Sequence, residues 1–172
     1  MTRLFTAALM FAAILVLPAC ESGDETAAPK KAAVTTKLVA PAGNDDDAWK
    51  FYLQQVVRQH MDAVTDRVFP YYLPANSTVP TPGDLENKSQ YDRQLENVSS
   101  AVSRTVLPGN MLVFGSPDSA KMADLIVAAF AGAKADSLRG SQVLFIGKPA
   151  DSDRVKAAAE ATGAKYLFVE DK

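Results

Sequence analysis

The sequence predicts an α/β domain in which two amino-terminal helices precede a small, mostly parallel sheet with flanking helices. Three observations support this fold class. Apolar residues recur at helical spacing after residue 45, three short apolar runs follow residue 110, and segments with helical periodicity separate these runs. Short apolar strands that alternate with helices are typical of a parallel sheet buried on both faces. We therefore expect a three-stranded βαβαβ unit.

The first helix is predicted between about residues 47 and 65. The acidic run at residues 45–47 stands where a helix amino terminus favours negative charge. The apolar stripe that follows keeps a spacing of three or four residues and comprises Trp49, Leu53, Val56, Val57, His60, Met61 and Val64. Because His60, the single histidine, shares this stripe, we favour a packing role for it over a role as ligand or catalytic base.

A proline-rich segment, residues 68–83, follows the first helix. Proline fixes φ and removes a backbone donor, so we expect this segment to be extended or turning rather than helical. Its aromatic residues are Phe69, Tyr71 and Tyr72. Two interpretations remain open: the aromatic side chains close over the core, which we favour, or they form an exposed protein-binding surface.

The second helix is predicted from an amino-terminal cap at Asp84 to the helix-breaking pair Pro108-Gly109. Its apolar stripe comprises Leu85, Tyr91, Leu95, Val98, Val102 and Val106. The spacing of three or four residues holds through most of this segment and indicates one buried face.

The carboxyl-terminal half carries the sheet. Residues 111–114, 142–146 and 165–169 are the predicted strands, and residues 118–131 and 151–162 are the predicted helices. Right-handed crossovers between parallel strands place both strand-to-helix turns at the carboxyl edge of the sheet, where open α/β folds bind ligands.

The two strand-to-helix turns are similar to each other. Each has a glycine where the strand ends, Gly115 or Gly147, and a proline near the start of the next helix. We expect Ser116 and Asp151 to cap these helices. Ser116, Ser119 and Lys148 are the candidates for binding an anion or polar ligand, together with the helix amino-terminal amides. We favour a second interpretation, in which glycine and proline serve only the geometry of tight turns.

No motif in the sequence supports catalysis. Neither turn has a nucleotide-binding glycine pattern, and the chain has neither a G-x-S-x-G nor an H-E-x-x-H motif. One cysteine and one histidine exclude an internal disulfide and a metal site with two histidines. We therefore expect no cofactor and no metal, and we lean against an enzyme. A net charge of −2 gives no electrostatic reason to bind nucleic acid.

The amino-terminal segment has the layout of an export signal. Arg3 gives it a positive start, and the apolar run at residues 4–17 is shorter than the roughly 20 residues that a membrane-spanning helix needs. The residues Leu17-Pro18-Ala19-Cys20 resemble the lipobox of bacterial lipoproteins, in which a leucine and a small residue precede the cysteine. Pro18 departs from the small residue usual at its position.

The resemblance to bacterial lipoproteins implies a signal peptide at residues 1–19, cleavage before Cys20 and attachment of lipid to the Cys20 thiol. Several acyl chains would anchor the protein stably to a membrane. Glu21, in place of the aspartate associated with inner-membrane retention, favours the outer membrane. Residues 20–44, rich in small and polar side chains, are predicted to form a flexible tether, and residues 45–172 a single globular domain.

These observations favour a periplasm-facing, membrane-anchored envelope lipoprotein that acts as a non-catalytic binding or scaffolding module. Its partner would be an envelope protein or a cell-wall component. The alternative is a small enzyme or ligand carrier that binds an anionic compound at the turns near Gly115 and Gly147. A third possibility is a structural subunit that uses the Trp49 helix or the aromatic segment.

Overall fold

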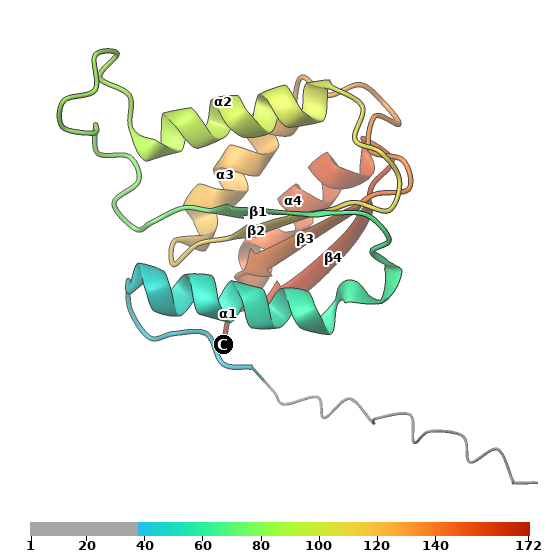
Figure 1. Ribbon diagram of the computed structural model, residues 1–172, viewed down its shortest axis with the longest axis horizontal. Coiled ribbons are helices and arrows are strands. Elements are labelled where there is room, and N and C mark those ends of the chain that lie inside the picture. The colour runs from blue at the N-terminus through green and yellow to red at the C-terminus, as the bar shows by residue number, and fades with distance from the viewer. Residues whose placement is uncertain (1–37) are drawn as a thin grey trace, which may run out of the picture. The chain divides into compact units, whose positions relative to one another are not determined.

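The computed structural model describes residues 38–172, which form a four-stranded, all-parallel sheet with helices on both faces (Figure 1). The strands are β1 (Val68–Tyr72), β2 (Met111–Gly115), β3 (Gln142–Gly147) and β4 (Lys165–Glu170), in that spatial order. The α/β class and the parallel sheet are confirmed. The expectations for the signal peptide, for Cys20 and for the tether up to residue 37 lie outside the described residues.

The helices are divided unequally between the two faces of the sheet (Figure 1). One face is covered by α1 (Asp46–Gln59), which a short 3-10 turn at Met61–Ala63 follows. The other face is covered by α2 (Gln90–Ser103), α3 (Ser119–Phe130) and α4 (Pro149–Glu160). Residues 38–172 therefore form three layers: α1 alone, the sheet, and the layer of α2, α3 and α4.

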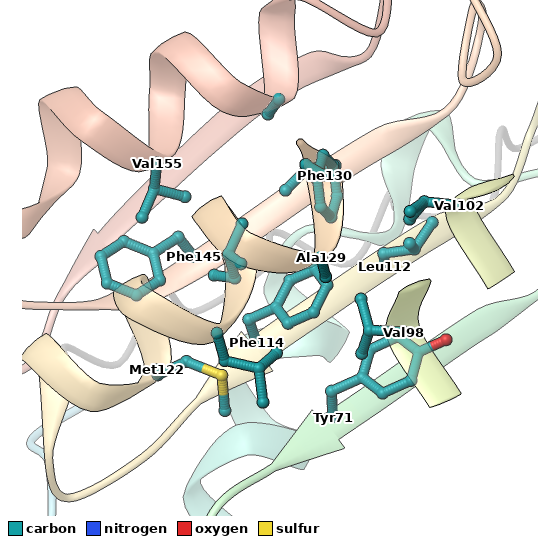
Figure 2. Close-up of a cluster of buried hydrophobic side chains, with 14 of the residues drawn as sticks. Tyr71, Val98, Val102, Leu112, Phe114, Met122, Ala129, Phe130, Phe145 and Val155 are labelled. Atoms are coloured by element: carbon teal, nitrogen blue, oxygen red, sulfur yellow. The ribbon is translucent and has the colours of Figure 1, made fainter. Parts of the chain in front are cut away.

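Alternate side chains of β2 and β3 build a separate core on each face of the sheet. Leu112, Phe114, Val143 and Phe145 point into the core beneath α2, α3 and α4. In this core the Phe114 ring stacks on Tyr71 with centroids 5.0 Å apart and meets the edge of Phe130 at 6.1 Å (Figure 2). Met111, Val113, Leu144 and Ile146 pack on Trp49, Tyr52, Leu53 and Val56 of α1.

Strand β1 corrects the three-stranded prediction. Residues 68–83 were predicted to be extended or turning because of their prolines, and Val68–Tyr72 are extended, but they form a fourth strand that pairs in parallel with β2. The Arg67 carbonyl accepts from the Met111 N–H (2.8 Å), and the Leu73 N–H donates to the Gly115 carbonyl (3.3 Å). Odd-numbered residues therefore bond to β2, and Pro70 turns its donor-less nitrogen toward the open edge, where proline is tolerated in a strand.

The second predicted helix differs in position and start. α2 lies between β1 and β2 rather than before the sheet, and it begins at Gln90 because Ser89 and Asp92 form a capping box. Asp84 does not cap a helix; its carboxylate accepts from the Glu86 and Lys88 N–H groups at 2.9 and 3.2 Å. Leu85, assigned to the buried stripe, is fully exposed.

The remaining helix boundaries differ by a few residues. α1 ends at Gln59, so the predicted helix to residue 65 was too long. Asp118, not Ser116, caps α3 through the Lys121 N–H (3.0 Å). At α4, Lys148 occupies the cap position without a side-chain bond, and Asp151 lies inside the first turn.

Candidate functional site

Ser119 joins the two similar turns at the carboxyl edge of the sheet. Its Oγ donates to Asp151 Oδ2 (2.6 Å) and accepts from the Lys148 N–H (2.8 Å), and the side chain is buried. The structure thus brings Ser119 and Lys148 together, as their positions in the sequence indicated. The bonds made by the Ser119 hydroxyl are internal and hold the start of α3 against the start of α4.

Ser116 lies in the turn itself and is fully buried. Its Oγ accepts a hydrogen bond from the Asp118 N–H at 3.0 Å. A serine hydroxyl that accepts from the N–H two residues later stabilises a tight turn. Ser116 therefore shapes the chain before α3, and its hydroxyl does not face an open surface.

Lys148 is the most accessible of the three candidate residues. Its Nζ donates to the Asp171 carbonyl oxygen (2.8 Å) and lies 3.0 Å from Asp171 Oδ1 as an ion pair. The Asp171 side chain is only 2% exposed, so the Lys148 ammonium compensates a buried carboxylate. An anionic ligand would therefore have to compete with Asp171 for this ammonium.

Asp151 is held by one partner on α3 and one on α4. Burial raises the pKa of this carboxyl, but the hydrogen bonds from Ser119 and Arg154 and the positive charge of Arg154 outweigh burial, so the pKa lies below its ordinary value. Arg154 donates to Asp151 Oδ1 (2.7 Å) and to the Ala120 carbonyl (2.9 Å), and it also pairs with Asp124. These contacts hold α4 against α3.

Two open hollows of about 440 and 480 Å³ meet at this edge and share Asn44, Pro117 and Lys148. The ionisable side chains that line them are Lys148, Lys172, Asp118, Asp151 and Asp171. Carboxylates outnumber ammonium groups in this set. Residues 38–172 contain no group of side chains suited to hold a metal ion.

Tyr52 lies beneath this edge and was not singled out by the sequence analysis. Its hydroxyl is buried and has no hydrogen-bond partner within residues 38–172. Burial and the nearby Asp171 charge raise the pKa of Tyr52, so it stays a neutral phenol. A buried hydroxyl without a partner costs stability. The predicted apolar stripe did not include Tyr52, and no local sequence pattern indicates that a buried hydroxyl will lack a partner.

His60 lies at the carboxyl-terminal cap of α1. Its Nδ1 donates to the Val56 carbonyl oxygen at 2.8 Å, and the ring is half-buried. This bond satisfies one of the last carbonyls of the helix. The contact agrees with the favoured interpretation of His60 as a packing residue.

An apolar hollow lies along the outer strand β1, on the face that α1 covers. This α1–β1 groove, of about 520 Å³, is lined by Lys50, Leu53, Gln54, Val57, Arg58, Val68, Pro70 and Tyr72. The Tyr72 hydroxyl donates to Asp46 Oδ1 (2.8 Å), and Lys50 Nζ lies 5.8 Å from the centre of the Tyr72 ring. These contacts fix one end of the groove.

A second, more polar hollow of about 560 Å³ lies on the other face of β1, next to α2. Its wall includes Arg67, Phe69, Asn97 and Arg104. Asn110 also lines this hollow. Its side chain accepts a hydrogen bond from the Arg67 N–H (3.0 Å) and donates one to the Leu107 carbonyl (2.8 Å), and so links two parts of the wall. Strand β1 is thus bordered by hollows on both faces.

The three aromatic residues near Pro70 differ in their burial. One closes over the core, and the other two are exposed or half-buried. Tyr71 is buried on Phe114, as expected of side chains that close over the core. Phe69 is 37% exposed, and Tyr72 is half-buried in the wall of the α1–β1 groove. No pattern in the sequence indicated the groove, because the groove depends on α1 lying beside a strand that was not predicted.

Comparisons with protein-family models, with curated proteins and with solved structures find no match to this chain. No helix within residues 38–172 is long and apolar enough to cross a membrane.

Proposed function

We propose that this chain is a bacterial envelope lipoprotein, anchored through lipid on Cys20 and facing the periplasm, whose domain is a non-catalytic module that binds another envelope component. The export signal at residues 1–19 and the lipobox-like residues before Cys20 support the anchor. Glu21 favours the outer membrane over the inner one. The partner would be an envelope protein or a cell-wall component.

The α1–β1 groove is the observation that carries the binding role. The candidate polar residues at the strand ends are bonded to other parts of the domain, whereas Val57, Val68 and Pro70 line a hollow that no described element covers. Sizeable apolar hollows at a protein surface are typical of interaction sites. This contrast favours a binding module over a catalyst.

Replacing the cysteine tests the anchor. Cys20→Ser removes the thiol that would carry diacylglycerol, so incorporation of labelled fatty acid should be lost and the domain should leave the membrane fraction. Ser22→Ala, two residues away, serves as the matched control and should retain both properties. Membrane retention of the Cys20→Ser protein would refute the lipid anchor.

Site-specific photo-crosslinking in living cells tests the binding role. A photoreactive residue in place of Gln54, which is exposed in the groove, should give one discrete adduct with an envelope component. The control position is Lys156, exposed on α4 at the opposite face of the sheet. Identical adducts from both positions, or none from Gln54, would contradict a binding site in the groove.

The alternative function is an enzyme or carrier that binds an anionic compound near Gly115 and Gly147. The hollows that meet at Lys148 favour it, but the Lys148 ammonium already contacts Asp171. Titration of the protein with inorganic phosphate, followed by NMR of the Ser116, Ser119 and Lys148 amides, distinguishes the two. Saturable shifts confined to these turns would favour the carrier.

A further inference from the structure

On the α1 side of the sheet, a single helix leaves strand β1 only partly covered. Four strands spaced about 4.8 Å apart make a surface roughly 19 Å wide, whereas one helix covers about 10 Å. Helix α1 takes the middle of this surface, where it packs on residues of β2 and β3 such as Val113 and Leu144. Val68 and Tyr72 of β1 are only half-buried there, and Pro70 is exposed.

The groove follows one side of α1 for about two helical turns. Gln54 follows Lys50 by four residues, and Val57 and Arg58 follow Gln54 by three and four, so these side chains form a ridge along that side. From Lys50 to Arg58 the rise is about 12 Å, at about 1.5 Å per residue. The groove is therefore long enough for two turns of an opposing helix.

Pro70 disfavours an added strand as the occupant of this edge. Val68, Pro70 and Tyr72 turn their backbone groups outward, and the central one of these residues has no N–H to donate. A partner strand that paired with β1 would lose its middle hydrogen bond, and edge prolines prevent pairing of this kind in natural sheets. Contacts in the groove must come from side chains instead.

The charges along the groove are positive. Lys50 stands near one end and Arg58 near the other, and no aspartate or glutamate lines the groove. Arg58 has no ion pair within residues 38–172, and the exposed Lys50 contacts Asp47 at 3.6 Å, a weak surface pair. An acidic partner fits these charges. A second copy that docked its own groove here by two-fold symmetry would bring like charges together.

We propose that the α1–β1 groove receives an amphipathic helix of a partner protein, with apolar side chains over Val57 and Val68 and acidic residues that reach Lys50 and Arg58. This inference rests on the proposed binding function and specifies the class of partner. It is the helix-in-groove mode of recognition, in which apolar side chains three and four residues apart anchor an amphipathic helix.

Binding of synthetic helices to the mature lipidated chain in nanodiscs tests the proposal. The probe is an 18-residue fluorescent peptide with one apolar stripe flanked by glutamates, and its twin carries lysines in their place. By fluorescence anisotropy the acidic peptide should bind about tenfold more tightly than the basic twin, as expected for two ion pairs at a surface. Lys50→Glu with Arg58→Glu should invert this preference, because both residues are exposed and their exchange leaves the core intact.

Further variants and peptides distinguish an acidic helix from a non-helical peptide and from a second copy of the chain as the occupant of the groove. Val57→Asp should abolish binding of the acidic peptide, and circular dichroism establishes that this variant is folded. A twin peptide with a central proline, which cannot form the helix, should bind at least tenfold more weakly. Equal binding of acidic and basic peptides, no saturable binding of the acidic peptide, or self-association that Val57→Asp abolishes would each overturn the proposal. If one of these results is found while photo-crosslinking at Gln54 still gives an adduct, only the proposal of a helical partner is refuted. If photo-crosslinking at Gln54 gives no adduct, the proposed binding function itself is refuted.

Discussion

Ser119→Ala tests whether the strand-end turns are held by internal bonds. The substitution removes the donor to Asp151 Oδ2 and the acceptor of the Lys148 N–H, and both hydrogen bonds are partly buried. A hydrogen bond to a charged group contributes about 1.5–3 kcal/mol and a neutral one about 1 kcal/mol. We expect the free energy of unfolding to fall by about 2.5–4 kcal/mol at pH 7, as the sum of the two.

The loss should depend on pH. The pKa of Asp151 is lowered in the folded protein, so its contribution is complete above the unfolded-state pKa, about 3.9, and is lost as the pH falls through the folded-state value. Ser119 supplies one of the bonds that lower this pKa. The difference between wild type and Ser119→Ala should therefore be largest at neutral pH and decrease below about pH 4.

Urea unfolding at pH 7 and at pH 3 measures both effects. Ser77→Ala is the matched control, because Ser77 is equally buried but its hydroxyl has no partner among the described residues. That control should be neutral or slightly stabilising. A loss of less than about 0.5 kcal/mol for Ser119→Ala at pH 7, within the range of ordinary surface substitutions, would refute the bonding scheme at this edge.

The other predictions concern α1 and β1. Gly115→Ala places a Cβ 2.9 Å from Leu53 Cδ1 and should cost about 1–3 kcal/mol by urea unfolding, whereas Gly132→Ala, with open space around it, should not. Tyr52→Phe removes a buried hydroxyl without a partner and should raise the free energy of unfolding by up to about 1 kcal/mol; a loss of stability would reveal a partner for it. Pro70→Val restores an N–H at the open edge of β1 and should increase self-association in light scattering, and unchanged association would show that Pro70 does not protect this edge.

The parts of the fold that the sequence predicted depend on local signals. The apolar runs of β2, β3 and β4, with glycine at residues 115 and 147, identified the parallel unit because segments of helical period separate these runs. β1 escaped prediction because Pro70 stands in the middle of its five residues, and only the tertiary position of the strand shows that the proline nitrogen faces outward. The start of α2 was misplaced because Asp84 and Ser89 are both good caps, and the capping box with Asp92 decides between them.

The candidate site was predictable only in part for a similar reason. The turns that hold Ser119 and Lys148 could be placed at one edge, since parallel strands and right-handed crossovers require it. The sequence did not indicate that Asp151 and Asp171 would neutralise this edge, because these contacts join residues 32 and 23 positions apart. The α1–β1 groove likewise arises between two segments whose contact no local pattern encodes.

The side chains at the strand ends are bonded to one another, whereas the apolar wall at β1 is open. This difference explains why a partner would bind at β1 rather than at the strand ends. At the strand ends, Ser119, Arg154 and Lys148 join α3, α4 and the end of the chain, so opening a ligand site there would expose the buried Asp171 carboxylate. At β1, the apolar wall is already formed and nothing among the described residues must move to admit a partner. Binding to a preformed surface loses less free energy to ordering than binding that first has to break internal bonds. The hydrogen bonds and ion pairs of Ser119, Arg154 and Lys148 hold the sheet in place. Because α1 and β1 form the groove on this sheet, these bonds favour docking at β1.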